Sequence, residues 1–396
     1  MLLRAALSAL LLSLVFSHAR AADLSGACCA DVEERVAELE ATAAKHGNRK
    51  MMVVIYGQVN YGWVDYTGIS GVPAGHSLSG IAMNSAAPTF LGIAGEAKVN
   101  ASLKAGFKLE FQMDDRPNLA TASAAFPNEV VMRQGVLWLD TVLGKVSVGH
   151  GSMASDNAGS VTVANTEVAS RLLSIAPMST VLAFGYDLPY NDVRRDMARY
   201  DTPTFLGFTV SASIANGDNV NVIGGPFPFN AKDAYDIALR YANEIGGAGG
   251  FRVAAAIAYR DEQQQLATLA IGFPTRSTVF DGSTSVMHMP TGIFLSVAGG
   301  VVRNDTLWGS FENYQVQGGW EKAIFKDIGA TTLFAEWATM HLDTPSKDIN
   351  MYGLGAVQNI QGLAMDIYGD WKRYDASAFA RGPQFDQFMV GARVKF

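Results

Sequence analysis

Charged side chains recur at a spacing of two residues in one stretch of the chain. Over residues 103–114 they alternate with apolar residues, and a shorter stretch before it shows the same spacing. Residues two apart on a β-strand point to the same face, so these charges are predicted to line one side of a sheet. Such rows of fixed charge can set the ion preference of an aqueous passage. The charged side chains are Glu96, Lys98, Lys104, Lys108 and Glu110.

The sequence contains no motif for catalysis or metal binding. HExxH, CxxC and the G-x-S-x-G elbow are absent, and Gly353-Leu354-Gly355 lacks the third glycine of a dinucleotide loop. The six histidines are scattered, and the two cysteines, Cys28 and Cys29, are adjacent, which excludes a disulfide framework. We therefore predict that the protein is not an enzyme and holds no cofactor or metal.

The composition narrows the class of protein. Hydrophobic residues make up 49% of the 396 residues and charged residues only 17%, which excludes a disordered chain. The 40 glycines have no three-residue period, which excludes collagen. The net charge of −7 gives no reason to expect a nucleic-acid partner.

The first 50 residues are predicted to divide into two parts. Residues 1–21 have a basic start, an apolar run and an A-x-A site at Ala19-Arg20-Ala21, which is typical of a secretory signal peptide. Residues 22–50 are predicted to be a periplasmic segment with a short coiled-coil helix over 31–45. This helix is either a trimerisation stalk or a solvated amphipathic helix.

Residues 51–396 are predicted to form one transmembrane β-barrel domain. After the signal peptide no apolar run reaches the ~18 residues of a membrane helix. The period is two from Met51 onward, with segments near the ~10 residues of a tilted membrane strand. We predict an all-β, 16-stranded antiparallel barrel with strands at about 52–66, 88–100, 103–114, 129–140, 144–151, 194–203, 206–216, 232–243, 249–261, 283–289, 292–303, 312–323, 329–340, 350–359, 362–374 and 385–396.

The connections between these strands alternate between short and long, as short periplasmic turns and long outer loops do in such barrels. The predicted long connections include 67–87, 115–128, 152–193, 217–231 and 262–282. Loop 152–193 is the longest and mixes acids with apolar stretches, so we predict that this third loop folds into the lumen. Asp156 and Glu167 are its candidate constriction residues.

Several motifs resemble Gram-negative general porins, and most closely the alphaproteobacterial (rhizobial-type) porins. The motifs lie at residues 28–40, 47–50, 56–58, 133–149, 199–208, 288–292 and 352–358. The resemblance implies a homotrimer in the cell outer membrane, in contact with lipid and lipopolysaccharide, that passes small hydrophilic solutes by passive diffusion. It also implies that the terminal Phe396 is read by the barrel assembly machinery.

Family porins carry wall arginines opposite acids on the third loop, and Arg133 and Arg199 lie in matching motifs. Arg240 and Arg252 are further wall candidates, since the two-residue period places them on the lumen face. Phe90 departs from the pattern, because many general porins place a constriction arginine there.

Three other functions stay open from the sequence. A substrate-specific channel is possible if lumen aromatics such as Tyr56 and Tyr368 form a track for sugars. A plugged structural or adhesive barrel and a soluble secreted β-protein would show the same alternation of residues.

Overall fold

The computed structural model describes residues 51–68, 79–84, 86–100, 102–114, 129–173, 193–216, 229–266, 274–304, 310–325, 327–343, 346–375 and 384–396. The predicted signal peptide, the N-terminal helix and the two cysteines lie outside these residues.

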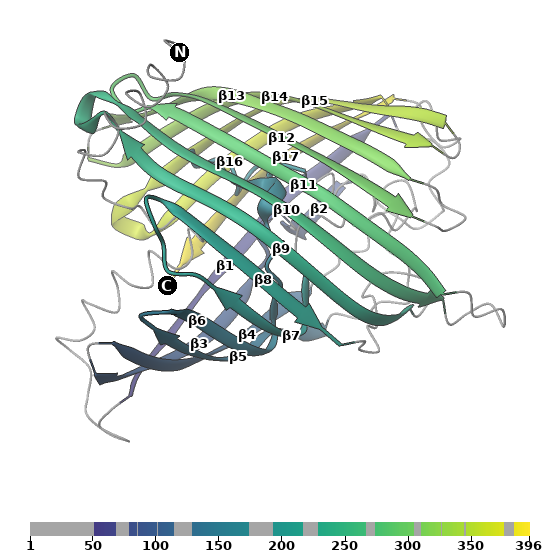
Figure 1. Cartoon of the computed structure of the whole chain (residues 1–396). Coiled ribbons are helices and arrows are strands. Elements are labelled where there is room, and N and C mark those ends of the chain that lie inside the picture. The colour runs from purple at the N-terminus through teal and green to yellow at the C-terminus, as the bar shows by residue number, and fades with distance from the viewer. Residues whose placement is uncertain are drawn as a thin grey trace, which may run out of the picture.

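The described chain is built almost entirely of β-strands (Figure 1). The strands are β1 (Met52–Thr67), β2 (Ser79–Met83), β3 (Phe90–Asn100), β4 (Leu103–Asp114), β5 (Glu129–Thr141), β6 (Gly144–Ser152), β7 (Arg194–Asp201), β8 (Phe208–Ala215), β9 (Phe229–Ile245), β10 (Phe251–Leu266), β11 (Pro274–His288), β12 (Ile293–Asn304), β13 (Phe311–Phe325), β14 (Gly329–Asp343), β15 (Ser346–Ile360), β16 (Met365–Asp375) and β17 (Gln384–Lys395). Three short 3₁₀ helices accompany them: η1 (Ala158–Ser160), η2 (Gly247–Gly249) and η3 (Gln361–Leu363).

The sheet closes on itself into a barrel. Neighbouring strands pair antiparallel in chain order, and β17 returns to β1 with a register from Gln58↔Lys395 to Thr67↔Asp386. β2 and β3 pair with different halves of β1, so together they fill one position in the wall. The wall therefore has sixteen strand positions, which confirms the predicted closed 16-stranded barrel.

Most strands lie within a few residues of their predicted bounds, and β4 matches its prediction. The predicted long loop 262–282 is wrong, because β10 continues to Leu266 and β11 already begins at Pro274. The sequence there is polar on both strand faces, so the alternation fades while the ladder continues from Asp261↔Thr278 to Gln265↔Pro274. The five-residue strand β2 was too short for the pattern to predict.

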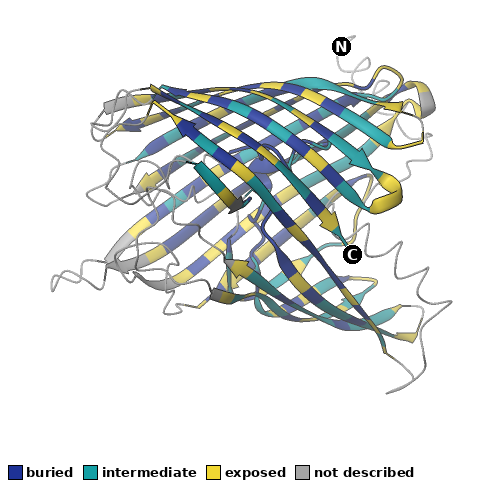
Figure 2. Ribbon diagram, turned by 180° about the vertical axis from the view of Figure 1, so that it is seen from behind, coloured by how far each residue is buried: buried dark blue, intermediate teal, exposed yellow. Residues whose placement is uncertain are grey.

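The two faces of the wall differ in exposure, since buried and exposed residues alternate along the strands (Figure 2). Outward apolar side chains are exposed, as with Ile55 at 65% and Leu137 at 68%. Inward polar side chains such as Asn60 and Gln317 are fully buried. An apolar belt of this extent would be unfavourable in water and suits contact with lipid.

The barrel has one short-turn end and one long-loop end. The described connecting residues 102, 142–143, 202–207, 246–250, 289–292, 327–328 and 361–364 lie at the short-turn end, together with Phe396, which pairs with Gly57 of β1. The opposite ends of the strands, where β6 leads into the third loop, form the long-loop end. No helix of the described residues is long and apolar enough to cross a membrane.

Glycines take part in the packing of this wall. Five of them lie directly across the ladder from an aromatic residue, and a Cβ on any of the five would lie 2.2–2.4 Å from an atom of the partner's aromatic side chain. The aromatic ring thus covers the glycine of the neighbouring strand, which gives one reason for the many glycines. The pairs are Tyr56–Gly92, Phe107–Gly95, Trp138–Gly106, Phe334–Gly355 and Tyr368–Gly391.

Candidate functional site

The third loop enters the lumen from the end of β6. Its described part, residues 153–173, includes η1, which lies inside the barrel beside β10, β11 and β12 (Figure 1). Met153, Ala154, Val168 and Leu172 of the loop are all buried. This placement supports the prediction that the loop folds inward and narrows the lumen.

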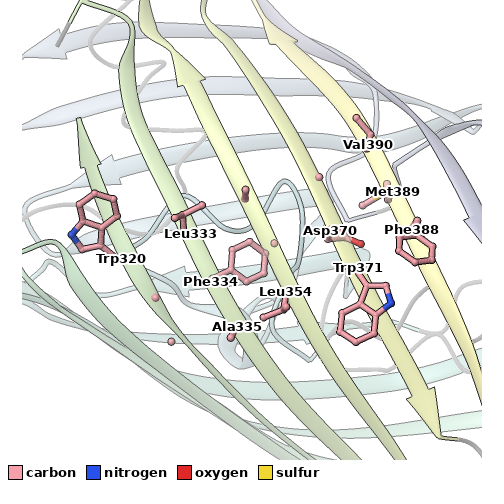
Figure 3. Close-up of a pocket in the computed structure, with 15 residues that line it drawn as sticks. Trp320, Leu333, Phe334, Ala335, Leu354, Asp370, Trp371, Phe388, Met389 and Val390 are labelled. Carbon is pink, nitrogen blue, oxygen red and sulfur yellow. The ribbon is translucent and has the colours of Figure 1, made fainter. Parts of the chain in front are cut away.

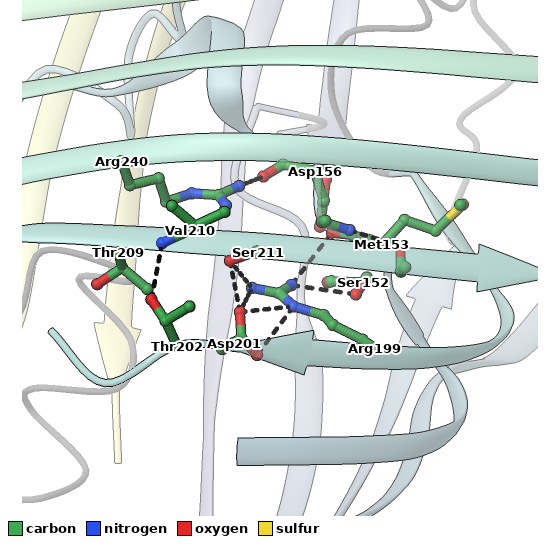
Figure 4. Close-up of polar contacts among 12 residues, drawn as sticks. Ser152, Met153, Asp156, Arg199, Asp201, Thr202, Thr209, Val210, Ser211 and Arg240 are labelled. Atoms are coloured by element: carbon green, nitrogen blue, oxygen red, sulfur yellow. Dashed lines mark hydrogen bonds and ion pairs between the residues drawn. The ribbon is translucent and has the colours of Figure 1, made fainter. Parts of the chain in front are cut away.

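Arginines of the wall hold the start of the loop (Figure 4). Arg199 of β7 donates from Nη1 to the carbonyl oxygens of Ser152 (3.2 Å) and Met153 (3.1 Å). Its Nη2 pairs with the carboxylate of Asp201 at 2.7 Å. Arg240 of β9 donates from Nη2 to the carbonyl oxygen of Asp156 at 2.7 Å. Arg199 and Arg240 therefore both lie at the loop, and both hold its backbone.

The middle of the loop is held by backbone donors. The amide of Ser155 donates to Asp236 Oδ2 of β9 at 2.7 Å. The amides of Ala154, Val161 and Val163 donate to the hydroxyl oxygens of wall serines at 2.8–3.1 Å. These serines are Ser213 of β8 and Ser283 and Ser285 of β11. The polar inner face thus satisfies loop amides that would otherwise be buried without partners.

Carboxylates hold the far part of the loop on the opposite wall. The amide of Asn165 donates to Glu321 Oε2 of β13 at 2.7 Å, and its side chain donates to Asp366 Oδ1 of β16 at 3.2 Å. The Ser170 hydroxyl donates to Glu336 of β14 at 2.7 Å. Acids on this side of the lumen are therefore bonded to the loop.

The wall on the β3–β5 side carries a different cluster, formed by Lys108, Glu110 and Arg133, which we call the basic wall cluster. Lys108 Nζ lies 2.8 Å from Glu110 Oε1, and Arg133 Nε lies 3.2 Å from Glu110 Oε2. The Tyr56 hydroxyl also donates to Glu110 Oε1, at 2.8 Å. One buried carboxylate thus serves two cations.

A β-bulge aims Arg133 into the lumen. The ladder between β4 and β5 pairs Glu110 with Gln134 and Phe111 with Met132, which leaves Arg133 as the extra residue of β5. Bulges commonly redirect a side chain in this way. The Arg133 guanidinium lies over the Phe90 ring, 5.4 Å from its centroid.

The two predicted acids of the loop have different surroundings. Asp156 is buried, with 4% of its surface exposed, and its Oδ1 accepts the amide of Val193 at 3.1 Å. The Glu167 side chain is 41% exposed and lies 3.7 Å from Arg171 Nε of the loop. Of the two, Glu167 is the one that meets solvent.

The remaining predicted residues lie away from the loop. Arg252 pairs with Glu244 at 3.0 Å near the short-turn end, so its predicted constriction role has no support from its position. Lys104 lies 3.5 Å from Glu96, and Lys98 pairs with Lys104 across the ladder toward the same end. In the described part of the chain, no group of three or more His, Cys, Asp or Glu side chains is arranged to hold a metal.

Lumen aromatics offer no free track for sugars at the two predicted positions. Tyr56 and Tyr368 are buried, and their hydroxyls donate to Glu110 and to Asn60 Oδ1. A hollow on β13–β17 is lined mainly by apolar residues, with the buried Asp370 as its charged residue (Figure 3). Its exposed lining side chains are apolar, among them Leu333, Leu354 and Val390, and they belong to the outward belt.

The comparisons with known proteins agree with this geometry. The family model described as Gram-negative porin matches residues 6–393. The chain belongs to this porin family. No curated protein matches the sequence of this porin.

Solved porin structures share the fold. An anion-selective porin from Comamonas acidovorans has 17% sequence identity, covers 87% of this chain and 100% of its own, and has a TM-score of 0.63. OmpT of Vibrio cholerae in its trimer form has 15% identity, covers 87% and 99%, and has a TM-score of 0.57. DcaP of Acinetobacter baumannii has 12% identity, covers 89% and 100%, and has a TM-score of 0.56.

Sequence reasoning did not single out the acidic wall residues that hold the loop of this porin. Asp236, Glu321 and Glu336 are 81 to 166 residues away from their loop partners. The two-residue period could have placed them on the lumen face, but it gives no information about which of them the loop reaches.

Proposed function

We propose that this porin forms a water-filled pore in the outer membrane for the passive diffusion of small hydrophilic solutes and ions, with a preference for anions. The observation that carries the anion preference is the excess of positive over negative side chains in the basic wall cluster. Loop groups donate to the wall acids Asp236, Glu321 and Glu336, whereas Lys108 and Arg133 lie on the wall beside Glu110, and Arg133 also donates to Gln112 at 2.9 Å.

The charges on the two sides of the passage can be compared directly. Among its own three members, the basic wall cluster has two cations and one carboxylate, so the cluster itself is net positive. On the loop, Glu167 lies near Arg171, which reduces its field. Charge at a narrow constriction selects ions, because low-dielectric walls strengthen the field there. We infer that anions enter more readily than cations of similar size.

The test is ion conductance in planar lipid bilayers. The purified porin should give stepwise conductance, and its reversal potential in a salt gradient should indicate anion preference. Lys108→Ala and Arg133→Ala should each move the reversal potential toward cations. Arg252→Ala is the matched control, since Arg252 also faces the lumen but lies near the short-turn end, and it should move the potential little. Absence of conductance would refute the pore itself, and unchanged potentials in both cluster variants would refute the anion preference.

Several finer expectations belong to the same proposal. The trimeric form of a similar structure supports a homotrimer, and the name of the Comamonas porin supports anion selectivity. The motifs at 28–40 and 199–208 support an alphaproteobacterial type of porin. Contact with lipopolysaccharide, recognition of Phe396 by the assembly machinery and the lack of enzymatic activity stay predictions.

A further inference from the structure

The wall of the barrel is interrupted at one place. β2 pairs with β1 as far as Tyr61↔Met83, and β3 resumes the pairing at Gln58↔Phe90. Residues 59 and 60 of β1 therefore face the connection between β2 and β3, which runs from 84 to 89. An insertion of this length is larger than a β-bulge, which adds one residue. We call the described residues of this connection, 84 and 86–89, the inward bend.

Hydrogen bonds show that the bend lies on the lumen side of the wall. Gln58 and Asn60 are the lumen-facing residues of β1 at this height, and their side chains donate to the carbonyl oxygens of Pro88 and Ala87, each at 2.8 Å. The amide of Asn60 also donates to Thr89 Oγ1 at 3.0 Å. Tyr368 of β16 donates to Asn60 Oδ1 at 2.7 Å. The bend is thus held by β1, and Tyr368 of β16 orients the Asn60 side chain that binds it.

One end of the bend reaches the third loop. The Asn84 side chain donates from Nδ2 to the carbonyl oxygen of Val168 at 2.7 Å. Asn84 Oδ1 accepts the amide of Ala86 at 2.9 Å, which fixes the orientation of the side chain amide. Asn84 and Val168 are both buried. The bond therefore gives the loop an anchor in addition to the one at Glu336.

The other end of the bend adjoins the basic wall cluster. The carbonyl oxygen of Thr89 accepts the amide of Met113 from β4 at 3.0 Å. Phe90 follows directly, and its ring lies under Arg133 and meets the Tyr56 ring edge-on at 6.1 Å between centroids. The bend therefore connects the loop to the positive side of the passage.

We propose that the inward bend is a second constriction element of this pore and that Asn84 is the positioning residue that ties the third loop to it. The passage is then bounded by the loop, the basic wall cluster and the bend between them. The bend sets the width of the passage where loop and cluster come closest. This inference rests on the proposed function, and the bilayer measurements below separate the two.

The first experiment asks whether the bend lines the passage. Ala86 is half-buried, so Ala86→Cys is made in a background with Cys28→Ser and Cys29→Ser. A negatively charged methanethiosulfonate reagent should modify Cys at position 86 and lower the single-channel conductance, and a reducing agent should restore it. Ser102→Cys, exposed at the short-turn end, is the control and should be modified without loss of conductance.

The second experiment asks whether Asn84 positions the loop. Asn84→Ala removes the donor to Val168, so the loop should move more, with a rise in conductance and in open-channel noise. Asn84→Asp adds a negative charge and should also move the reversal potential toward cations. The matched control is Asn100→Ala, which loses a single hydrogen bond to the amide of Ser102 at the short-turn end.

These outcomes distinguish the two proposals. A parent channel that does not conduct overturns the proposed function. If the parent conducts, the inference about the bend fails when position 86 is not modified, or is modified without loss of conductance. It also fails when both Asn84 variants match Asn100→Ala in conductance, noise and reversal potential. Should Asn84→Ala not fold, as judged by its mobility on an unheated gel, the labelling at position 86 still decides.

Discussion

Arg133 and Arg199 show how neighbours, rather than residue type, decide the role of a lumen arginine. The sequence predicts the same constriction role for both. In the structure, Arg199 donates to two carbonyl oxygens of the loop, whereas Arg133 stands at a bulge beside Glu110. A guanidinium that donates to loop carbonyl oxygens positions the loop, whereas one that lies on the wall beside a second cation adds positive charge to the passage.

Substitution of Arg199 should therefore lower stability more than it changes selectivity. Arg199→Ala leaves the carbonyl oxygens of Ser152 and Met153 without their side-chain donor, and we expect a loss of about 1–3 kcal/mol in the free energy of unfolding. The measurement is unfolding in urea, in which the folded fraction is read from the mobility of unheated samples on a gel. Arg133→Ala is the comparison, and it should change ion selectivity more than it lowers the free energy of unfolding. Equal selectivity changes in the two variants would contradict this assignment.

Glycines opposite aromatic residues should be sensitive to a single methyl group. A Cβ at position 355 would lie 2.2 Å from an atom of the Phe334 ring, so Gly355→Ala forces the ring to move. Overpacking of this kind typically costs about 1–3 kcal/mol. Gly318→Ala is the matched control on the neighbouring strands, because the nearest atom would be 3.6 Å away. In urea denaturation, Gly355→Ala should unfold at a lower urea concentration than Gly318→Ala. Equal midpoints would argue against close packing of the Phe334 ring on Gly355.

At the scale of elements, the period of two predicts strands only where the two faces differ in polarity. β4 is predicted to the residue because Phe107 and Lys108 alternate faces between lipid and lumen. The prediction ends β10 too early and begins β11 too late, because both strand faces are polar there and the alternation that indicates a strand is lost. The bulge at Arg133 and the inward bend depend on long-range ladder register, which a local pattern does not contain.

The third loop also lies beyond local pattern. Its length and composition predict that it folds inward, but its path follows acceptors on strands β8 to β16. These acceptors look like ordinary lumen residues in the sequence. The approximate site was therefore predictable, whereas the division between anchoring residues and the basic wall cluster needed the register of the whole sheet.

Loss of one anchor should make the loop more mobile under voltage. Asp236→Ala removes the acceptor of the Ser155 amide, and that amide then lies buried without its partner. We expect channel closures at lower applied voltage and more current noise in planar bilayers. Glu244→Ala on the same face of β9 is the control, because Glu244 pairs with Arg252 away from the loop. Identical closure voltages for the two variants would show that this anchor does not restrain the loop.

At the scale of the whole molecule, closure of the sheet explains the composition. A closed barrel has no unpaired edge, so the backbone is satisfied within lipid. Among the described residues, outward apolar side chains such as Val53 and Val390 are exposed, and polar side chains line the lumen. A hydrophobic content of 49% therefore reflects an outward belt around a polar interior.

The seam between β1 and β17 is where closure can be tested. Phe396 donates its amide to the carbonyl oxygen of Gly57 at 3.1 Å and accepts the Gly57 amide at 2.9 Å, so it contributes the last pair of the seam. A Cβ at Gly57 would meet the Phe396 ring at 2.8 Å, which shows how closely the ring covers the glycine. Deletion of Phe396 removes both hydrogen bonds and the ring together.

Two variants separate the contribution of Phe396 to the stability of the seam from its recognition by the barrel assembly machinery. Deletion of Phe396 should lower the yield of folded barrel in the outer membrane and the stability of barrel refolded in detergent. Phe396→Ala retains the backbone pair, so the refolded barrel should lose less stability, through packing alone. If assembly in cells depends on the aromatic ring, the yield of Phe396→Ala should still fall as far as that of the deletion. Unchanged yield in cells for Phe396→Ala would refute the predicted assembly signal and leave Phe396 with only its role in the seam.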